Sequence, residues 1–198
     1  MNFLAHLYLS SDHPGIMTGN FIGDFVKGRD LDARFGFYVA RGIDLHRIID
    51  EFTDKHPQVR NSRARLWDSY RHYARVIVDV YYDHFLARDW QKFHPVPLQQ
   101  YAPQAYETLL THEEILPDGV KQMLPYMMRG NWLLNYSQLE GIDRALTGMS
   151  RRTRFESNME KAVHDLQRYY PEFEHEFGQF FPTLQEMTSR WLQENVKR

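Results

Sequence analysis

The sequence predicts an all-α fold, a multi-helix bundle in a single domain that spans residues 1–198. Two observations favour it. Alternating β-branched runs are almost absent, and most of the nine prolines lie between segments of helical length, where they separate one helix from the next. The length of 198 residues, with 42% hydrophobic side chains and neither an internal repeat nor a linker-like stretch, fits one domain with its own core.

The individual helices follow from apolar positions that recur at helical spacing. The segment 76–82 has the β-branched residues of a strand, but its apolar pattern continues to residue 87 without a turn signal, which favours a helix. The segment 60–92 is long enough for two helices, and Pro182 is expected to break or kink the last helix. The expected helices span residues 2–10, 16–27, 37–55, 60–92, 98–114, 119–128, 131–147, 152–169 and 172–195.

Composition excludes several classes of protein. The 24 Lys and Arg residues against 26 Asp and Glu residues give a net charge of −2, whereas nucleic-acid binding usually shows as a strong basic excess. No apolar run reaches the ~18 residues of a membrane span, and the first residues lack the basic start of a signal peptide, so we expect a cytoplasmic protein. The patterns of nucleotide-binding loops and of the serine-hydrolase elbow are absent. Because the chain has no Cys, a metal site would have to use His, Asp and Glu.

The segment 37–55 carries an imidazole and carboxylates beside its apolar stripe. At about 100° per residue, the stripe consists of Leu45, Ile48, Ile49 and Phe52. The neighbouring face consists of His46, Asp50, Thr53 and Asp54. This face borders the buried stripe, so its side chains are held near the core and within reach of one another. The spacing fits a metal site, and it equally fits a solvated helix face with a local His–Asp pair.

The segment 76–90 is apolar nearly all round, which is typical of a buried helix, yet it contains Asp79 and Asp83. Burying an ionised carboxylate without a partner costs several kcal/mol. The two carboxylates therefore need a metal ion, a hydrogen-bond network or an arginine, and the residues leave these alternatives open. His84 lies on the opposite side of this helix, where a core histidine or a supporting group is expected.

Two further residues are candidates on weaker grounds. His6 lies in the apolar segment 3–9, where a lone histidine is more often a core residue than a ligand. Asp24 follows Gly19 and Gly23, whose i, i+4 spacing permits a second helix to approach closely at some cost in helix propensity. A carboxylate next to such a close contact points to a site.

Five segments together resemble the bacterial acyl carrier protein phosphodiesterases, and they extend over nearly the whole chain. They are MNFLAHLYLS at 1–10, GNFIGDFVKG at 19–28, GIDLHRIIDEFTD at 42–54, DVYYDHFLARDW at 79–90 and GMSRRTRF at 148–155. The resemblance implies a divergent, all-helical relative of the HD-type metal phosphohydrolases. It also implies a manganese-dependent hydrolase that cleaves the phosphodiester between 4′-phosphopantetheine and a serine of holo-acyl carrier protein. The products would be apo-carrier and 4′-phosphopantetheine.

This chemistry suits the residues already singled out, because a divalent ion lowers the pKa of bound water and offsets charge on phosphoryl oxygens. The expected metal ligands are His6, Asp24, His46 and Asp79. The expected catalytic residues are Asp24, Asp50 and Asp83. Each would bind the ion, orient a histidine or accept a proton from the attacking water. Supporting groups around them are expected to be Asp54 and His84.

An acidic carrier protein as substrate implies a basic docking surface, and the sequence has two candidate clusters. The favoured cluster is Arg151, Arg152 and Arg154, and the other is Arg60, Arg63 and Arg65. Each cluster also fits a solvated charged face. Two other functions fit the chain: a related metal phosphohydrolase with a nucleotide-type small substrate, and a non-enzymatic helical module in which His and Asp are structural.

Overall fold

The computed structural model describes residues 1–196, and every regular element in this range is helical, which confirms the all-α prediction. The α-helices are α1 (Phe3–Tyr8), α2 (Pro14–Ile22), α3 (Leu31–Phe35), α4 (Phe37–Lys55), α5 (Pro57–Tyr70), α6 (Ala74–Arg88), α7 (Leu98–Leu110), α8 (Asp118–Arg129), α9 (Trp132–Asn135), α10 (Leu139–Ser150), α11 (Ala162–Arg168) and α12 (Tyr170–Asn195). The 3₁₀ turns are η1 (Gly23–Phe25), η2 (Arg71–Tyr73), η3 (Trp90–Lys92), η4 (Glu113–Ile115) and η5 (Met159–Lys161).

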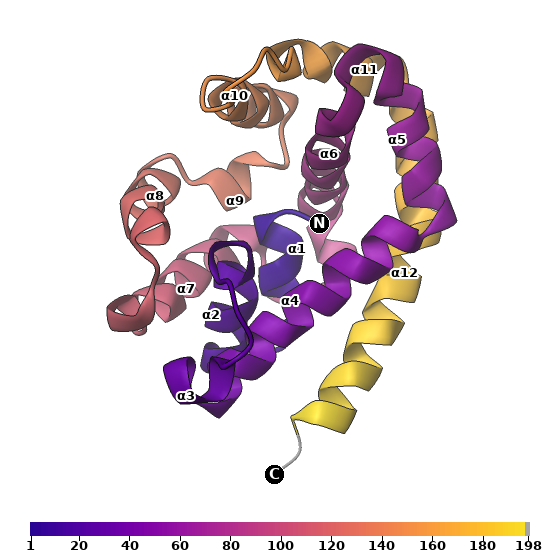
Figure 1. Ribbon diagram of the computed structural model, residues 1–198. Helices are drawn as coiled ribbons and strands as arrows, with labels where there is room; N and C mark the ends of the chain where they lie inside the picture. Colours follow the sequence, from indigo (N-terminus) through magenta and orange to yellow (C-terminus); the bar gives the residue numbers. More distant parts are fainter. Residues whose placement is uncertain (197–198) are drawn as a thin grey trace.

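Helix α4 crosses the molecule, and the helices around the candidate site are arranged along it (Figure 1). Helix α2 packs along α4, and α1 packs on both α2 and α6. Helices α5 and α12 contact α4 toward its C-terminal end, whereas α7 to α10 form the opposite flank, beyond α1 and α2. The N-terminus therefore lies in the middle of the molecule, next to α1.

Helix α6 is the centre of the hydrophobic core, as its all-round apolar pattern predicts. The rings of Tyr81, Tyr82 and Phe85 are fully buried. They meet the rings of Phe173 and Phe177 on α12, with centroid separations of 5.0, 5.5 and 5.8 Å. Such aromatic pairs stabilise a fold by about 0.5–1.5 kcal/mol each beyond the area they bury. The core therefore fixes α6 against α1, where Asp79 lies beside the candidate site and Asp83 contacts the first turn of α1.

The close contact between α2 and α4 depends on two glycines. A Cβ atom on Gly19 would lie 2.0 Å from the carbonyl oxygen of Val39, and one on Gly42 would lie 2.2 Å from the carbonyl oxygen of Ile16. Neither position has room for a side chain. One turn further along, a Cβ atom on Gly23 would lie 2.2 Å from the ring of His46. The close helix approach expected from the i, i+4 glycines is therefore confirmed.

Three of the expected helices are interrupted or shortened. The segment 60–92 is divided into α5 and α6 at Arg71, whose positive φ of 50° ends the right-handed helical path of α5. This confirms the division that its length permits. The helix expected over 152–169 is wrong in its first half, because residues 151–158 form a loop that ends with Asn158 at φ 54°. The segment 131–147 is likewise divided into α9 and α10.

The other differences concern α2, α3 and α12. Helix α2 ends at Ile22 and continues only as the turn η1, and α3 was not expected. Helix α12 passes through Pro182, so a break at this proline is wrong. Buried Phe180 and Phe181 precede the proline, and their packing outweighs the lost backbone hydrogen bond.

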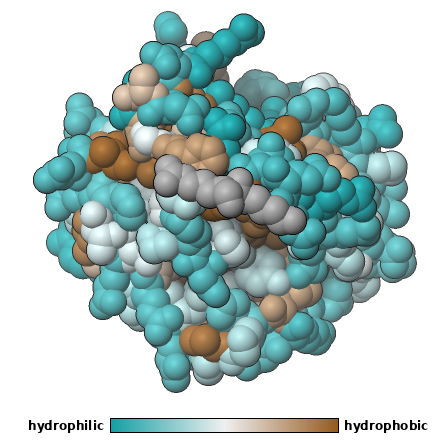
Figure 2. Space-filling view, turned by 90° about the horizontal axis from the view of Figure 1, so that it is seen from below, coloured by the Kyte–Doolittle hydropathy of each residue, from teal (hydrophilic) through white to brown (hydrophobic). Residues whose placement is uncertain are grey.

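The surface is largely hydrophilic on the face seen from below in Figure 2, where hydrophobic side chains appear only in separate spots. Within residues 1–196, every helix is too short or too polar to cross a lipid bilayer.

Candidate metal centre

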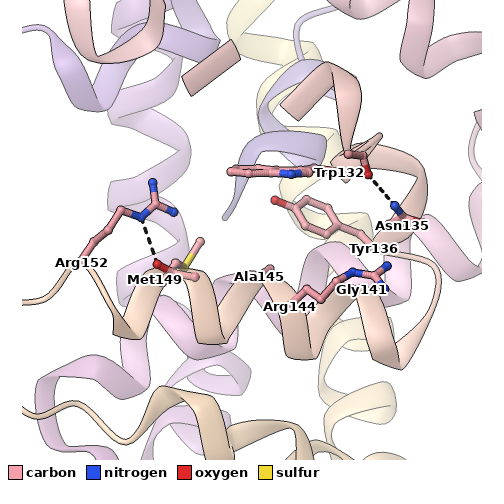
Figure 3. A pocket seen from close by; sticks show the side chains of 10 residues that line it. Trp132, Asn135, Tyr136, Gly141, Arg144, Ala145, Met149 and Arg152 are labelled. Carbon is pink, nitrogen blue, oxygen red and sulfur yellow. Dashed lines mark hydrogen bonds between the residues drawn. The ribbon is translucent and has the colours of Figure 1, made fainter. Parts of the chain in front are cut away.

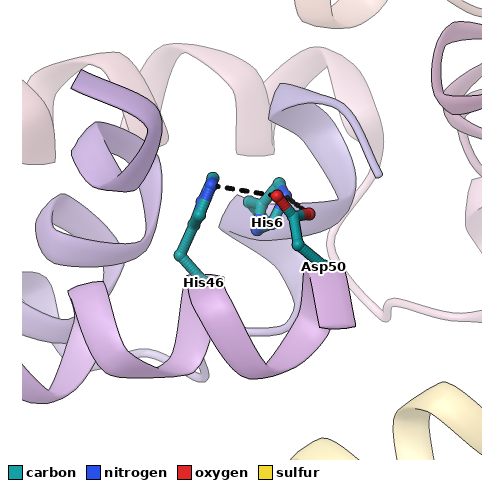
Figure 4. A group of neighbouring side chains, drawn as sticks. All are labelled: His6, His46 and Asp50. Carbon is teal, nitrogen blue, oxygen red and sulfur yellow. Dashed lines mark ion pairs between the residues drawn. The ribbon is translucent and has the colours of Figure 1, made fainter. Parts of the chain in front are cut away.

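Three side chains from two helices converge between α1 and α4 (Figure 4). His6 Nε2 lies 3.4 Å from Asp50 Oδ1, and His46 Nε2 lies 3.4 Å from Asp50 Oδ2. The two imidazole rings are stacked with their centroids 4.1 Å apart. One ligand atom from each of the three residues lies within 4.8 Å of the other two, so the group could hold a metal ion. Nitrogen and carboxylate oxygen are the donors that divalent first-row metals accept.

Asn20 on α2 determines which nitrogen of each ring carries hydrogen. Its side-chain amide donates to the carbonyl oxygen of His6 at 2.7 Å, which leaves its Oδ1 to accept from His6 Nδ1 at 2.7 Å. The backbone carbonyl of the same residue accepts from His46 Nδ1 at 2.8 Å. A carbonyl oxygen only accepts, so both Nδ1 atoms carry hydrogen and both Nε2 atoms face Asp50. Metal-binding histidines are commonly oriented by a hydrogen bond of this kind from the second ring nitrogen.

His6 Nε2 is a buried polar atom without a hydrogen-bond partner. With its hydrogen on Nδ1, this nitrogen presents a lone pair to a carboxylate oxygen, an unfavourable contact that a cation between the two atoms would make favourable. Buried polar atoms are rarely left unpaired, because each costs about 1–3 kcal/mol. The donor set and this unpaired atom fit a divalent metal ion.

The charges of the cluster depend on its three groups together. Burial lowers the pKa of His46, but hydrogen bonds with Asp24 and Asp50 outweigh burial and raise this pKa to about 9. Burial and the neighbouring His46 lower the pKa of His6. Burial works to raise the pKa of Asp50, but the contact with His46 holds it well below its usual range. Without an ion, the cluster thus holds one imidazolium, one neutral imidazole and one carboxylate, and binding a cation would release the proton from His46.

Asp24 borders this cluster on its solvent side. Its Oδ1 lies 3.2 Å from His46 Nε2, while its side chain is 73% exposed. The hydrogen bond with His46 lowers the pKa of Asp24, so this carboxylate is ionised at neutral pH. Gly23, which lacks a side chain, permits this close approach to the ring of His46. The structure therefore brings four of the expected residues together: His6, Asp24, His46 and Asp50.

Asp79 lies beside the cluster but has other partners. Its Oδ1 is 3.1 Å from the amino nitrogen of Met1 and 3.9 Å from Arg63. The same amino group lies 3.7 Å from Asp50 Oδ1. A cationic group thus stands between Asp79 and the cluster. The structure does not include Asp79 in the group that could hold an ion, and its role as a ligand stays a prediction.

Asp83 is positioned as the cap of another helix. Its side chain is fully buried and accepts hydrogen bonds from the backbone N–H groups of Leu4 at 2.7 Å and Ala5 at 3.2 Å. These are otherwise unsatisfied donors in the first turn of α1. Burial raises the pKa of Asp83 to about 7, although the two N–H groups act in the opposite direction. The structure does not place this carboxylate in the cluster, and its catalytic role also stays a prediction.

The two residues expected to support the ligands have separate structural partners. Asp54 pairs with Arg63 at 2.9 Å and with Arg75 at 2.8 Å. His84 is buried, with Nδ1 donating to the carbonyl oxygen of Tyr136 at 2.8 Å and Nε2 2.7 Å from the hydroxyl of Tyr170. Neither contacts the cluster through a described hydrogen bond or ion pair.

The two arginine clusters differ in whether their side chains form ion pairs within the protein or are exposed. Arg63 pairs with Asp54, and Arg65 pairs with Glu176 at 2.8 Å, so the first cluster is largely engaged inside the protein. Arg151, Arg152 and Arg154 are exposed in the loop 151–158. Phe155 in the same loop is 68% exposed. The second cluster therefore has the accessibility that docking requires.

Asn20 is the site residue that the sequence analysis missed. Its i, i+4 spacing with Asp24, next to Gly19 and Gly23, is a signal that could have indicated it. The role itself depends on a backbone carbonyl as much as on a side chain, and the sequence does not reveal where a carbonyl points.

Comparison with known proteins decides the family. The family model described as acyl carrier protein phosphodiesterase matches residues 1–184. The chain belongs to this family. A relative from Escherichia coli O6:H1, named acyl carrier protein phosphodiesterase, is 37% identical over 195 residues, covering 96% of this chain and 98% of the relative. Relatives of the same name from Photorhabdus laumondii and Serratia proteamaculans are 34% and 35% identical, covering 94% and 93% of this chain and 94% and 95% of their own. No solved structure matches the chain.

Proposed function

We propose that this acyl carrier protein phosphodiesterase family member hydrolyses the phosphodiester between 4′-phosphopantetheine and the serine of holo-acyl carrier protein, using a divalent metal ion. The observation that carries the metal dependence is the unpartnered, buried Nε2 of His6 beside Asp50 and His46. The substrate rests on family membership over residues 1–184. We also propose a cytoplasmic location, a manganese ion and an HD-like arrangement of the helices, as the sequence resemblance implies.

His6, His46 and Asp50 would hold the ion. When bound, a divalent ion would lower the pKa of a water molecule and offset negative charge on the phosphoryl oxygens. Asn20 keeps both Nε2 atoms directed at Asp50, so that the ligands are oriented before an ion binds. Positioning of this kind is the main contribution of a protein to phosphoryl transfer.

Asp24 has the position of a proton acceptor. Its carboxylate is ionised, exposed to solvent and 3.2 Å from His46 Nε2, so it borders the place where substrate and water arrive. We assign it to accept a proton from the attacking water at Oδ1 or Oδ2. General-base catalysis of this type contributes about 10²–10⁴-fold.

The proposed reaction is tested by incubating the purified chain with holo-carrier protein and Mn²⁺, with and without a chelator, and measuring the intact mass of the carrier. We expect loss of the phosphopantetheine mass only when the ion is available. We expect Asp50→Ala to lower kcat by about 10³-fold or more, as loss of several kcal/mol of charge stabilisation implies.

Glu51→Ala is the matched control, because Glu51 is the next acidic residue on α4, is exposed and pairs only with Lys55 among the described residues. It should retain wild-type activity. Mn²⁺-independent release of phosphopantetheine, or an active Asp50→Ala variant, would remove the proposed metal mechanism. Cleavage of nucleotide-type esters without action on holo-carrier would favour a small-molecule substrate.

Docking of the acidic carrier is assigned to the exposed loop 151–158. Because Arg152 also lines a pocket between α9 and α10, the test changes Arg151 and Arg154 to Glu. We expect KM for holo-carrier to rise at least about tenfold at low salt, with a smaller effect at high salt, since exposed charges act through screened electrostatics. A control with the same charge change at Arg60 and Arg190 should leave KM unchanged, and an equal rise in this control would refute the assignment.

A further inference from the structure

A second concave site lies between α9 and α10 (Figure 3). It is a cavity of about 180 Å³. The residues that matter for its chemistry are Trp132, Tyr136, Arg144, Gly148, Met149 and Arg152. The indole of Trp132 lies over the ring of Tyr136, and α10 closes the opposite side. None of these residues belongs to the metal cluster.

The lining combines apolar walls with free hydrogen-bond donors. Trp132, Tyr136 and Met149 supply the apolar part. Arg144 is exposed and has no hydrogen-bond or ion-pair partner among residues 1–196, and Arg152 uses only its Nε, which donates to the carbonyl oxygen of Gly148 at 3.1 Å. Among the described residues, no acidic side chain lines the cavity. Such a site suits a chain that carries hydrogen-bond acceptors, such as amide carbonyls, between short apolar stretches.

The pocket is connected to the metal cluster through the N-terminal residues. The Tyr136 hydroxyl accepts a hydrogen bond from the side-chain amide of Asn2 at 3.2 Å. The neighbouring residue, Met1, places its amino nitrogen 3.7 Å from Asp50 Oδ1. The path from Asp50 to Tyr136 consists of these two contacts and of Met1 and Asn2 between them. Because consecutive Cα atoms lie about 3.8 Å apart, the path is at most about 16 Å long.

The proposed substrate has a neutral arm of the same reach. Thirteen bonds join the phosphorus of phosphopantetheine to its thiol sulfur, which corresponds to about 16 Å when three extended bonds span roughly 3.8 Å. The arm contains two amides, two methyl groups and no charge beyond the phosphate. A phosphodiester at the metal cluster would leave the cysteamine end of this arm within reach of the pocket.

We propose that the pocket between α9 and α10 binds the distal, amide-containing end of the pantetheine arm. This inference rests on the proposed function, because it takes the phosphodiester to lie at His6, His46 and Asp50. Trp132, Tyr136 and Met149 pack on the methylene groups, and the Arg144 and Arg152 guanidinium groups donate to the amide carbonyls. The pocket thereby selects diesters that carry a long amide chain over short ones.

The test fills the pocket at Gly148 and uses Gly178 as the control. A Cβ atom added at Gly148 or at Gly178 meets nothing within 4 Å, so both helices accept a side chain. Gly148 lines the pocket, whereas Gly178 is exposed on α12. Gly148→Leu should raise KM for holo-carrier at least tenfold and leave hydrolysis of bis(4-nitrophenyl) phosphate, a diester without the arm, unchanged. Gly178→Leu should change neither.

Free pantetheine is the second probe, and its binding is measured by calorimetry on the wild type and both variants. We expect binding to the wild type and to Gly178→Leu, and at least tenfold weaker binding to Gly148→Leu. If the wild type releases phosphopantetheine from holo-carrier but Gly148→Leu keeps both its KM and its pantetheine affinity, the pocket assignment is refuted while the proposed function stands. If the wild type does not act on holo-carrier at all, the proposed function fails, and pantetheine binding alone decides the pocket: equal affinity in the two variants overturns it.

Discussion

Two buried polar clusters in this chain differ in how completely their atoms are paired. Glu176 on α12 is almost fully buried, and its carboxylate accepts two hydrogen bonds from Arg65, at 2.8 and 2.9 Å, and another from Ser62. Ser62 also contacts the hydroxyl of Tyr82 at 2.9 Å. His6 and His46 are similarly buried, yet their cluster with Asp50 leaves His6 Nε2 without a partner.

The difference separates a cluster that stabilises the fold from the cluster for which we propose ion binding. A polar group that serves the fold has its hydrogen bonds completed by the protein itself, as Glu176 has. In the histidine cluster, Asn20 holds the Nδ1 atoms and both Nε2 atoms face one carboxylate. We propose a cation as the partner that His6 Nε2 lacks. The following changes test this distinction.

The largest effect on stability is expected at the paired cluster. Glu176→Ala leaves Arg65 and Ser62 without their acceptor, and removing one member of a buried ion pair costs about 3–5 kcal/mol. We expect this loss in the free energy of unfolding measured with urea, together with an unchanged affinity for Mn²⁺. Exposed Glu174→Ala on the same helix serves as the control. A large loss of Mn²⁺ affinity in Glu176→Ala would mean that the two clusters are not independent.

A smaller effect, on ion binding, is expected at Asn20. Asn20→Ala removes the acceptor of His6 Nδ1 but keeps the backbone carbonyl that orients His46, and loss of one such supporting group weakens metal binding by about 10–100-fold. Calorimetric titration with Mn²⁺ measures this directly.

Ser10→Ala is the matched control for Asn20. Ser10 belongs to the same buried network, where its hydroxyl contacts the carbonyl oxygen of His6 and the amide of Asn20, but it touches neither imidazole ring. It should lose stability without losing Mn²⁺ affinity. Equal losses of affinity in the two variants would show that general loosening, and not ring orientation, is responsible.

The most gradual effect is the pH dependence contributed by Asp83, which is spread over several pH units. Burial raises its pKa in the folded protein to about 7, above the 3.8 of a free side chain. The folded state thus binds the proton more tightly, so the contribution of Asp83 to stability is greatest below pH 4 and declines as pH rises toward 7, by at most about 1.4 kcal/mol per pH unit.

Asp83→Asn removes this titration and keeps one acceptor for the first turn of α1. The free energy of unfolding of the wild type, measured in urea between pH 4 and 8 and expressed relative to this variant, should therefore fall with rising pH and level off above pH 7. A difference that stays constant across this range would contradict the raised pKa.

The elements with a regular pattern were predictable from the sequence. The 3.6-residue period of α4 places His46 and Asp50 on one face beside the buried stripe, and both lie in the cluster. Gly19 in α2 and Gly23 at the start of η1, spaced i, i+4, predict the close contact with α4. Periodicity reports which face of a helix is buried, and these inferences use nothing else.

Long-range partners were not predictable in the same way. The sequence shows that Asp79 and Asp83 need compensation, but it does not show that an amino group and Arg63 face the first, or that the N–H groups of α1 face the second. The position of the break between α5 and α6 was not predictable for a similar reason. Arg71 has a positive φ, but no Gly or Pro marks the position in the sequence. Such features depend on which helices meet, which one sequence does not specify.

Both imidazoles are anchored to residue 20, one through its side chain and the other through its carbonyl oxygen. Any displacement of α2 relative to α1 and α4 therefore moves both anchors at once and shifts the Nε2 atoms of both rings. Gly19, whose backbone lies directly against α4, limits this displacement although it is not part of the site. At the proposed metal site, selectivity for ionic radius would therefore respond to substitutions in a helix interface, with every proposed ligand atom left chemically intact.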